Sequence, residues 1–247
     1  MLELINIHKS FGDRKVLDGV NFKLERGKIY TLMGANGTGK TTLVNIISGF
    51  LKADKGEIIL KKKNINGLSI IEINSLGVTR TFQNQRLIEK LIVKDNILLA
   101  FKKNKGENFL YSFLSNRMLK KYLLYFNNLA EVILKEVFLS DLALCKAGEI
   151  SYGQQKLLSL GCCIANDAEL LLLDEPVAGI NTMYKEKIIF LIKEMKKKGK
   201  TILLIDHNID FIEAVSDRIF FLNEGTIQYF NNYQNFKNNS IVQEAYL

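Results

Sequence analysis

Residues 34–41 read Gly34-Ala35-Asn36-Gly37-Thr38-Gly39-Lys40-Thr41. They match the phosphate-binding pattern G-x-x-x-x-G-K-[ST], and the hydrophobicity of the chain predicts a strand before them, over 28–33, and a helix after them, over 40–48. Glycines let backbone N–H groups approach phosphates closely, while the lysine adds charge and the final threonine offers a hydroxyl to Mg²⁺. The alternative is a glycine-rich turn before a helix, but the strand and the Lys-Thr ending favour a nucleoside triphosphate site.

The composition is that of an ordinary soluble globular protein. The 247 residues are 47% hydrophobic, and no apolar run approaches the roughly 18 residues that span a bilayer. The chain starts with alternating apolar residues and not with a signal peptide, so we expect a cytoplasmic protein. The three cysteines, Cys145, Cys162 and Cys163, show no metal-ligand spacing or disulfide framework, and we interpret them as buried small side chains in a reducing compartment.

The net charge of +8 raises the question of a nucleic-acid partner. The basic runs at 61–63, 102–105 and 196–198 fall at predicted turns or helix ends and lack interleaved aromatic residues. Solvated surface explains them better, so no nucleic acid is expected. A basic balance also suits a protein that works against anionic lipid.

Hydrophobic patterns along the chain predict an α/β fold. Two alternating stretches near the N-terminus predict antiparallel strands, and two later apolar runs predict buried parallel strands. Between Thr81 and Asn166 the strand signal gives way to helical periodicity. We therefore expect a single domain, 1–247, with a P-loop NTPase core, an N-terminal antiparallel β portion and an inserted helical subdomain. The antiparallel strands are expected at 2–8 and 16–24, the parallel strands at 170–174 and 201–206, the core at 1–84 and 167–247, and the helical subdomain at 85–166.

Polar residues follow the predicted parallel strands, where a sheet of this kind binds ligands. Asp174 and Glu175 end one run, and Asp206-His207 ends another. Asp174 is expected to reach the metal together with Thr41, and Glu175 to polarise the attacking water as general base. Pro176, the only proline, should push Glu175 out of the helical region into extended geometry. The alternative is a strand that ends in solvated acids, which the phosphate loop makes less favoured.

Gln83 and His207 complete the expected catalytic set. Gln83 follows the run from Gly77 to Phe82 and is interpreted as a metal ligand and sensor, whereas His207 is expected at the γ-phosphate. Taken alone, the amide would be an exposed side chain and the imidazole a turn residue. Their roles rest on the other residues of the pattern.

The segment Ile150-Ser151-Tyr152-Gly153-Gln154-Gln155 predicts a second helix start. Ser151 and Gln154 have the spacing of a capping box for a helix that runs to about Asn166. Capping does not explain Gly153, since a glycine in a helix costs up to about 1 kcal/mol relative to alanine. Close approach of a phosphate to an open helix N-terminus does explain it.

The order of these motifs resembles the nucleotide-binding subunit of an ABC transporter over nearly the whole chain. The resemblance implies ATP and Mg²⁺ as cofactors, and two subunits that close head to tail, so that the Ser151 helix of one completes the Lys40 site of the other. It also implies that Phe11 stacks on the adenine, where a tyrosine is more usual. The nucleotide-binding residues implied are Phe11, Gly34, Ala35, Asn36, Gly37, Thr38, Gly39, Lys40, Thr41 and Thr42, with Ser151, Tyr152, Gly153 and Gln154 acting in trans; the metal ligands are Thr41, Gln83 and Asp174.

Finer features are similar to the ATP-binding subunit of branched-chain (hydrophobic) amino-acid importers. They are the stretches 80–84 (RTFQN), 178–181 (AGIN) and 242–247 (VQEAYL), together with the glutamine-rich signature. This resemblance implies a subunit on the cytoplasmic face of the cell membrane that energises transport. Its partners would be an identical or sister cassette, transmembrane permease subunits with a helix docked near 84–100 and, indirectly, a solute-binding protein.

Two other functions remain open. One is a soluble ABC-type ATPase that serves cofactor or scaffold assembly. The other is the ATPase of a related urea, lipid or lipopolysaccharide transporter. The RTFQN segment disfavours this function but does not exclude it. DNA-repair relatives need a long coiled coil after Gln83, but Ser151 follows Gln83 by only 68 positions (151 − 83), and this stretch shows no sustained heptad repeat.

Overall fold

The structure is a computed structural model that describes residues 1–81, 87–101 and 116–245. The chain folds as two compact units: the first comprises Met1–Arg80, Ala168–Ala178 and Ile192–Leu247, and the second comprises Thr81–Asp167 and Gly179–Leu191. The second unit thus also takes up residues 179–191, which the sequence analysis assigned to the core. The exact domain boundaries remain a prediction.

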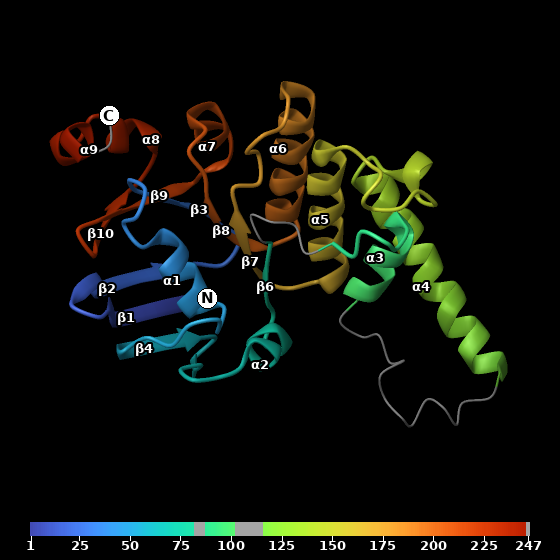
Figure 1. Ribbon diagram of the computed structural model, residues 1–247, viewed down its shortest axis with the longest axis horizontal. Helices are drawn as coiled ribbons and strands as arrows, with labels where there is room; N and C mark the ends of the chain where they lie inside the picture. Colours follow the sequence, from blue (N-terminus) through green and yellow to red (C-terminus); the bar gives the residue numbers. More distant parts are fainter. Residues whose placement is uncertain (82–86, 102–115, 246–247) are drawn as a thin grey trace. The chain divides into compact units, whose positions relative to one another are not determined.

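A six-stranded sheet forms the centre of the first unit (Figure 1). Its strand order is β10-β9-β3-β8-β7-β6; the strands from β9 to β6 run parallel, and β10 pairs antiparallel with β9. Every residue of the three central strands is buried, as expected for a parallel sheet covered on both faces. The strands are β3 (Ile29–Met33), β6 (Val78–Arg80), β7 (Leu170–Asp174), β8 (Thr201–Ile205), β9 (Arg218–Asn223) and β10 (Thr226–Phe230).

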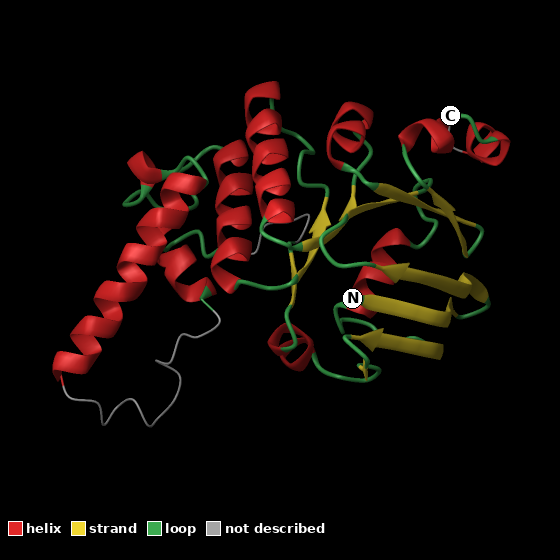
Figure 2. Cartoon of the chain, turned by 180° about the vertical axis from the view of Figure 1, so that it is seen from behind, coloured by secondary structure: helices red, strands yellow, loops and turns green. Residues whose placement is uncertain are grey.

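The second sheet of this unit has the order β2-β1-β4-β5 and is antiparallel. Helix α1 lies between the two sheets, as Figure 2 shows, and all three contribute side chains to one core. Aromatic rings join the sheets, since the Phe220 ring lies 4.8 Å from that of Phe22 and stacks on that of Tyr30 at 5.3 Å. The elements are β1 (Leu2–Phe11), β2 (Arg14–Leu24), β4 (Lys55–Leu60), β5 (Lys63–Asn64) and α1 (Lys40–Ile47).

Short helices complete the first unit. They are α2 (Ile70–Ser75), α7 (Ile209–Val215), α8 (Tyr233–Lys237) and α9 (Ser240–Ala245). Helices α7, α8 and α9 supply Ile212, Phe236 and Val242 to a smaller apolar cluster that includes Met33 and Phe221 of the sheet. This cluster covers one face of the parallel strands that lead to the phosphate loop.

The second unit is helical. Helix α3 packs against both α4 and α5. The Ser151 hydroxyl accepts the Gln154 N–H and the Gln154 side chain accepts the Ser151 N–H, so the predicted capping box is confirmed. The elements are α3 (Val93–Ala100), α4 (Asn116–Glu136), a 3₁₀ turn η3 (Ser140–Leu142), α5 (Tyr152–Asn166) and α6 (Thr182–Lys197), whose last turns belong to the first unit.

These elements confirm the predicted fold class. The expected strands at the N-terminus and at 170–174 and 201–206 are present within three residues at each boundary, whereas β9 and β10 were not predicted. Among the described residues, no helix has both the length and the apolar character needed to cross a bilayer.

The hairpin of β1 and β2 packs tightly against the phosphate loop. Gly39 has φ +106°, and a Cβ there would lie 2.6 Å from Val16 Cγ1 and 3.2 Å from Val16 O. Arg14 Nη2 donates to Gly37 O at 3.2 Å, a second contact between hairpin and loop. The hairpin therefore fixes the path of the loop into α1.

We expect Gly39→Ala to lower the free energy of unfolding by about 2 to 4 kcal/mol, because it adds both backbone strain and a steric clash. Gly27→Ala is the matched control, since Gly27 also has positive φ but has open space around it, and it should cost only about 1 kcal/mol. Urea denaturation measures both. Equal losses in the two variants would contradict the tight packing of hairpin and loop.

Candidate functional site: a phosphate loop beside two carboxylates

The predicted phosphate loop connects β3 to α1, and Lys40 holds it together. The buried Lys40 ammonium donates to Gly34 O at 2.7 Å and to Ala35 O at 2.8 Å, and the Thr38 hydroxyl also donates to Ala35 O at 2.9 Å. Helix α1 begins after Gly39 with no side-chain cap, so its first N–H groups have no side-chain acceptor at the cap. An uncapped helix start beside a buried lysine is the arrangement that binds phosphate groups.

Only glycine fits at the first loop position. Gly34 has φ +150°, and a Cβ there would lie 2.4 Å from the Leu222 carbonyl oxygen and 2.9 Å from Thr38 Oγ1. The end of β9 therefore sets how the chain leaves β3. This contact explains Gly34 by local packing, in addition to the phosphate approach inferred from the sequence.

The two predicted carboxylates lie near Lys40. Asp174 is the last residue of β7 and is 7% exposed, and Glu175 follows it. Burial lowers the pKa of Lys40, while the negative charges of Glu175 and Asp174 oppose this shift. The lysine and both acids therefore lie within electrostatic range of one another, as the sequence analysis expected.

The backbone of Glu175 differs from the expectation. Pro176 was expected to make Glu175 extended, but its φ is +47°, in the left-handed region. The prediction of extended geometry is wrong, although the proline does keep Glu175 out of the right-handed helical region. Two hydrogen bonds hold this conformation: the Glu175 N–H donates to Ile205 O at 2.9 Å, and Glu175 O accepts from Ala178 N–H at 3.3 Å. Such a conformation costs about 1 to 3 kcal/mol in a residue other than glycine.

The turn after β8 brings His207 to the same edge of the sheet. The buried Asp206 carboxylate accepts the N–H groups of His207 and Asn208, each at 2.8 Å. Burial raises the pKa of Asp206, these N–H donors lower it, and the charge of Glu175 raises it further. Asp206 thus shapes the turn that carries His207 and lies within electrostatic range of Glu175.

Phe11 lies at the end of β1 with 51% of its surface exposed. The Lys9 ammonium lies 5.5 Å from the centroid of its ring. A half-exposed ring on the hairpin that contacts the phosphate loop is compatible with the predicted stacking on adenine. Gln83, the other predicted ligand, lies outside the described residues.

The signature segment starts α5 in the second unit, and an aromatic ring packs on its glycine. A Cβ at Gly153 would lie 2.3 Å from Tyr184 Cδ2 and 2.6 Å from Tyr184 Cγ. The Ser151 hydroxyl lies 3.4 Å from the Tyr184 hydroxyl. The sequence analysis attributed Gly153 to phosphate approach alone, so the packed ring is a second reason for glycine that it missed.

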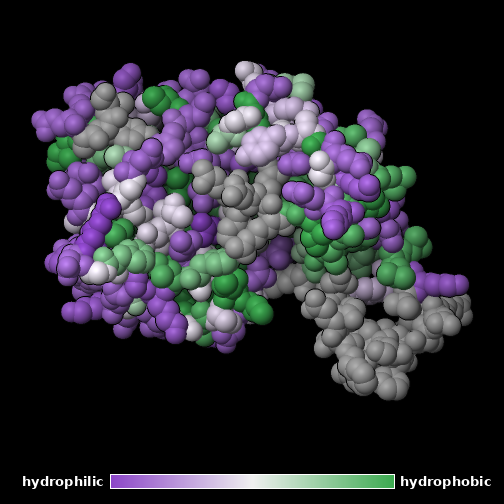
Figure 3. Space-filling view, viewed as in Figure 1, coloured by the Kyte–Doolittle hydropathy of each residue, from purple (hydrophilic) through white to green (hydrophobic). Residues whose placement is uncertain are grey.

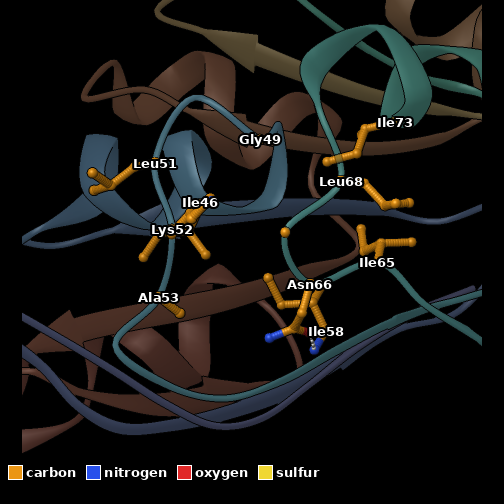
Figure 4. Close-up of a pocket in the computed structure, with 11 residues that line it drawn as sticks. Ile46, Gly49, Leu51, Lys52, Ala53, Ile58, Ile65, Asn66, Leu68 and Ile73 are labelled. Carbon is orange, nitrogen blue, oxygen red and sulfur yellow. Dashed lines mark hydrogen bonds between the residues drawn. The ribbon is translucent and has the colours of Figure 1, made fainter.

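A pocket of about 120 Å³ in the first unit lies at the far end of α1 (Figure 4). Its walls are mostly apolar, with Lys52 as the only charged side chain. The lining residues are Ile46, Gly49, Leu51, Lys52, Ala53, Ile58, Ile65, Asn66, Gly67, Leu68 and Ile73. Apart from Lys52 the described lining carries no ionisable side chain, and the predicted catalytic residues lie near the opposite end of α1.

Three positioning residues were missed by sequence reasoning. They are Arg80, which pairs with Asp174, Asp206, which shapes the His207 turn, and Tyr184, which packs on Gly153. An acidic residue one position before the histidine, with the spacing of an Asx turn, is a signal that could have revealed Asp206. The contacts of Arg80 and Tyr184 join residues far apart in the chain and leave no local signal.

A loop of the phosphate-binding pattern after β3, with acids at the carboxyl ends of the parallel strands β7 and β8, is typical of a P-loop nucleoside triphosphatase. The family model described as "ABC transporter" matches residues 17–178. The chain belongs to the ABC transporter family, as an ATP-binding and ATP-hydrolysing cassette of the transport-coupled type.

Curated relatives extend this similarity to the full length. The chain is 34% identical over all of its length, and 95% of the relative's, to the "Probable branched-chain amino acid transport ATP-binding protein LivG" of Archaeoglobus fulgidus. It is 32% identical over all of its length, and 97% of the relative's, to the "High-affinity branched-chain amino acid transport ATP-binding protein LivG" of Escherichia coli.

Solved structures agree. The chain matches the ADP conformation of an ATP-binding cassette of an ABC transporter with a TM-score of 0.82 and 33% identity, covering 100% of this chain and 98% of that one. It also matches a dimeric ATP-binding cassette bound to ADP and phosphate with a TM-score of 0.78 and 26% identity, covering 94% and 98% of the two chains. Cassettes of this family bind nucleotide and form dimers.

The strain at Glu175 predicts an unusual order of stability among variants. Glu175→Gly should be about 1 kcal/mol more stable than Glu175→Ala, because only alanine keeps a Cβ in the left-handed region. Glu224 has the same φ of +47° in the turn before β10, so its alanine and glycine variants set the reference difference. Thermal unfolding compares the four proteins. An alanine variant at 175 as stable as the glycine variant would show that the site holds no such strain.

The two explanations of Gly153 can be separated. Gly153→Ala should destabilise the chain by about 1 to 3 kcal/mol, because the new methyl group displaces the Tyr184 ring. In a Tyr184→Ala background the same change should be neutral or stabilising, since alanine favours the helix. If a partner's phosphate also approaches Gly153, the double variant should regain stability but still hydrolyse ATP more slowly than Tyr184→Ala. Full recovery of hydrolysis would leave packing as the only role of Gly153.

Proposed function

We propose that this chain energises an importer of branched-chain or other hydrophobic amino acids by binding and hydrolysing Mg²⁺-ATP between two cassettes. The observation that supports the site is the position of Asp174 and Glu175 at the end of β7, close enough to Lys40 for their charges to raise its pKa against the effect of burial. The substrate class rests on the names of the full-length relatives, which are branched-chain amino acid transport proteins. These names favour amino-acid transport over the other functions that the sequence left open.

The donor set fits Mg²⁺ bound together with nucleotide. Among the described residues, no three His, Cys, Asp or Glu side chains cluster as metal ligands. Mg²⁺ is commonly held by one or two protein oxygens together with substrate phosphates, and Asp174 and the Thr41 hydroxyl provide such oxygens. Asp174, Thr41 and Gln83 would hold the ion, which supplies charge neutralisation at the β- and γ-phosphates.

The remaining side chains act on nucleotide and water. Lys40 and the loop N–H groups bind the phosphates, and Glu175 polarises the attacking water as general base. Its strained backbone, tied to Ile205 O, supports this role because it restricts where the carboxylate can lie. His207 would contact the γ-phosphate, and Phe11 would stack on the adenine.

The second half of each site would come from another cassette. Ser151, Tyr152, Gly153 and Gln154 would approach the γ-phosphate bound to the partner's loop, with the α5 N-terminus directed at it. The capping box orders this helix start in advance. The match to a dimeric cassette supports the arrangement, and the partner would be an identical or a sister subunit.

The helical unit offers a surface for the permease. Figure 3 shows hydrophobic surface gathered over α3 and α4. Leu99 on α3 is 54% exposed, and Ile88, before that helix, is 50% exposed. Both belong to the segment 84–100 that the family resemblance assigns to the permease helix, of which 84–86 lie outside the described residues. Exposed apolar residues of this kind suit a protein partner. The permease subunits would receive their solute from a solute-binding protein. Docked to these subunits, the cassette would be cytoplasmic and peripheral on the membrane.

We expect Glu175→Gln to bind ATP with nearly normal affinity and to slow hydrolysis by about 10² to 10⁴-fold, because an amide cannot accept the proton of the attacking water. ATP should then drive dimerisation of the variant, which light scattering detects. The measurements are phosphate release and nucleotide titration.

Glu149→Gln is the matched control, since Glu149 is an exposed acid paired with Lys146 in the second unit, and it should hydrolyse ATP at the normal rate. Near-normal hydrolysis by Glu175→Gln would remove Glu175 from its role. A hydrolysis-deficient variant that stays monomeric at high concentration with ATP would contradict the shared site.

A further inference from the structure

We propose that Arg80 is a positioning residue that holds the metal carboxylate Asp174 in register with the face of α1 that carries Thr41. The inference rests on the proposed function only in taking Asp174 and Thr41 as metal ligands. Arg80 itself contacts neither nucleotide nor metal in this proposal.

Arg80 is the last residue of β6, and four residues of the same unit surround its guanidinium. Nη2 donates to Asp174 Oδ2 at 3.0 Å, and Nη1 donates to Asn45 Oδ1 at 2.5 Å and, at 3.4 Å, to Ser48 Oγ. The carbon at the centre of the guanidinium lies 5.9 Å from the centroid of the Phe50 ring. The Arg80 and Asp174 side chains are only 6% and 9% exposed. The guanidinium thus joins the end of β7 to α1 in a buried setting.

The spacing of residues on α1 shows why the contacts of Arg80 concern the metal site. Residues four and seven positions apart lie on one face of a helix, so Thr41, Asn45 and Ser48 share a face. The residues that hold Arg80 are therefore on the same face as the hydroxyl assigned to the metal. Across the sheet, Arg80 pairs with Leu172, two residues before Asp174 on the same side of β7. One guanidinium therefore links α1 and β7, the elements that carry Thr41 and Asp174.

Arginine suits this task better than lysine. Its planar fork can donate to a carboxylate from one nitrogen and to an amide oxygen from another at fixed geometry, whereas an ammonium is a point charge on a flexible stem. The competing explanation is a buried ion pair that only neutralises Asp174 and packs on Phe50. The two explanations make different predictions. Only the positioning role requires that the contribution of the metal to nucleotide binding falls when the guanidinium is replaced by an ammonium.

The test is calorimetric titration of the full chain with ADP, in Mg²⁺ and in EDTA, which requires no turnover. The ratio of the two dissociation constants gives the contribution of the metal. We expect Arg80→Lys to reduce this ratio by about 10 to 100-fold, the usual effect of losing a residue that orients a metal ligand. The dissociation constant in EDTA should change by less than about threefold, since the phosphate loop is intact.

Three further variants make the result decisive. Arg218→Lys is the matched control, since Arg218 at the start of β9 donates only to the carbonyl oxygens of Asp217 and Asn231 among its described hydrogen bonds, and the metal contribution should not change. Asn45→Ala removes the nearer of the two Nη1 acceptors but leaves Ser48 and the ion pair, so it should give a smaller loss in the same direction and serves if Arg80→Lys fails to fold. Asp174→Asn should abolish most of the contribution.

The outcomes separate this inference from the function beneath it. A metal contribution unchanged in both Arg80→Lys and Asn45→Ala, but lost in Asp174→Asn, overturns the positioning role and leaves the metal site standing. A contribution retained in Asp174→Asn, or absent in the unsubstituted protein, overturns the metal assignment itself.

Discussion

The site depends on one geometric constraint, the common carboxyl edge of neighbouring parallel strands. Strands β3, β8, β7 and β6 are hydrogen-bonded neighbours, and the chain leaves each of them in the same direction. Lys40, Asp174, His207 and Arg80 therefore lie at or just beyond the same edge of the sheet although they are far apart in the sequence. The strand register fixes how far along the sheet each residue lies: Asp174 pairs with Ile205, one residue before the turn at Asp206 begins. Every later step of the chemistry uses this alignment.

Charged groups at this edge of the sheet lower the stability of the first unit locally, through buried carboxylates and a left-handed backbone. A buried carboxylate requires a partner, and Arg80 provides one for Asp174, while backbone N–H groups serve Asp206. Glu175 adds a left-handed backbone that a glycine would adopt more easily. The largely apolar strands β3, β7 and β8 compensate, because every one of their residues is buried. The edge thus carries buried charge at Asp174 and Asp206 and a left-handed backbone at Glu175.

The sequence was sufficient for features whose causes are local. The phosphate loop, the capping box of Ser151 and the runs of β7 and β8 each lie within a few consecutive residues, and the structure has all of them. Features that depend on contacts between distant residues were beyond it. The ring of Tyr184 on Gly153 joins positions 31 residues apart (184 − 153), and Arg80 of β6 contacts Asp174 at the end of a different strand. Glu175 shows a further limit, since a following proline excludes one conformation without choosing among the others.

The environment of Lys40 is compatible both with a loop that is formed without ligand and with the binding of a triphosphate. Its ammonium is buried and donates to the Gly34 and Ala35 carbonyls, so the loop is already shaped before any phosphate contact. Burial lowers the pKa of Lys40, and the negative charges of Glu175 and Asp174 oppose this shift. A triphosphate would supply negative charge, but it would also repel Glu175 and Asp174. In the proposed function a divalent cation held by Asp174 would relieve that repulsion, so the orientation of this carboxylate by Arg80 would affect the whole site.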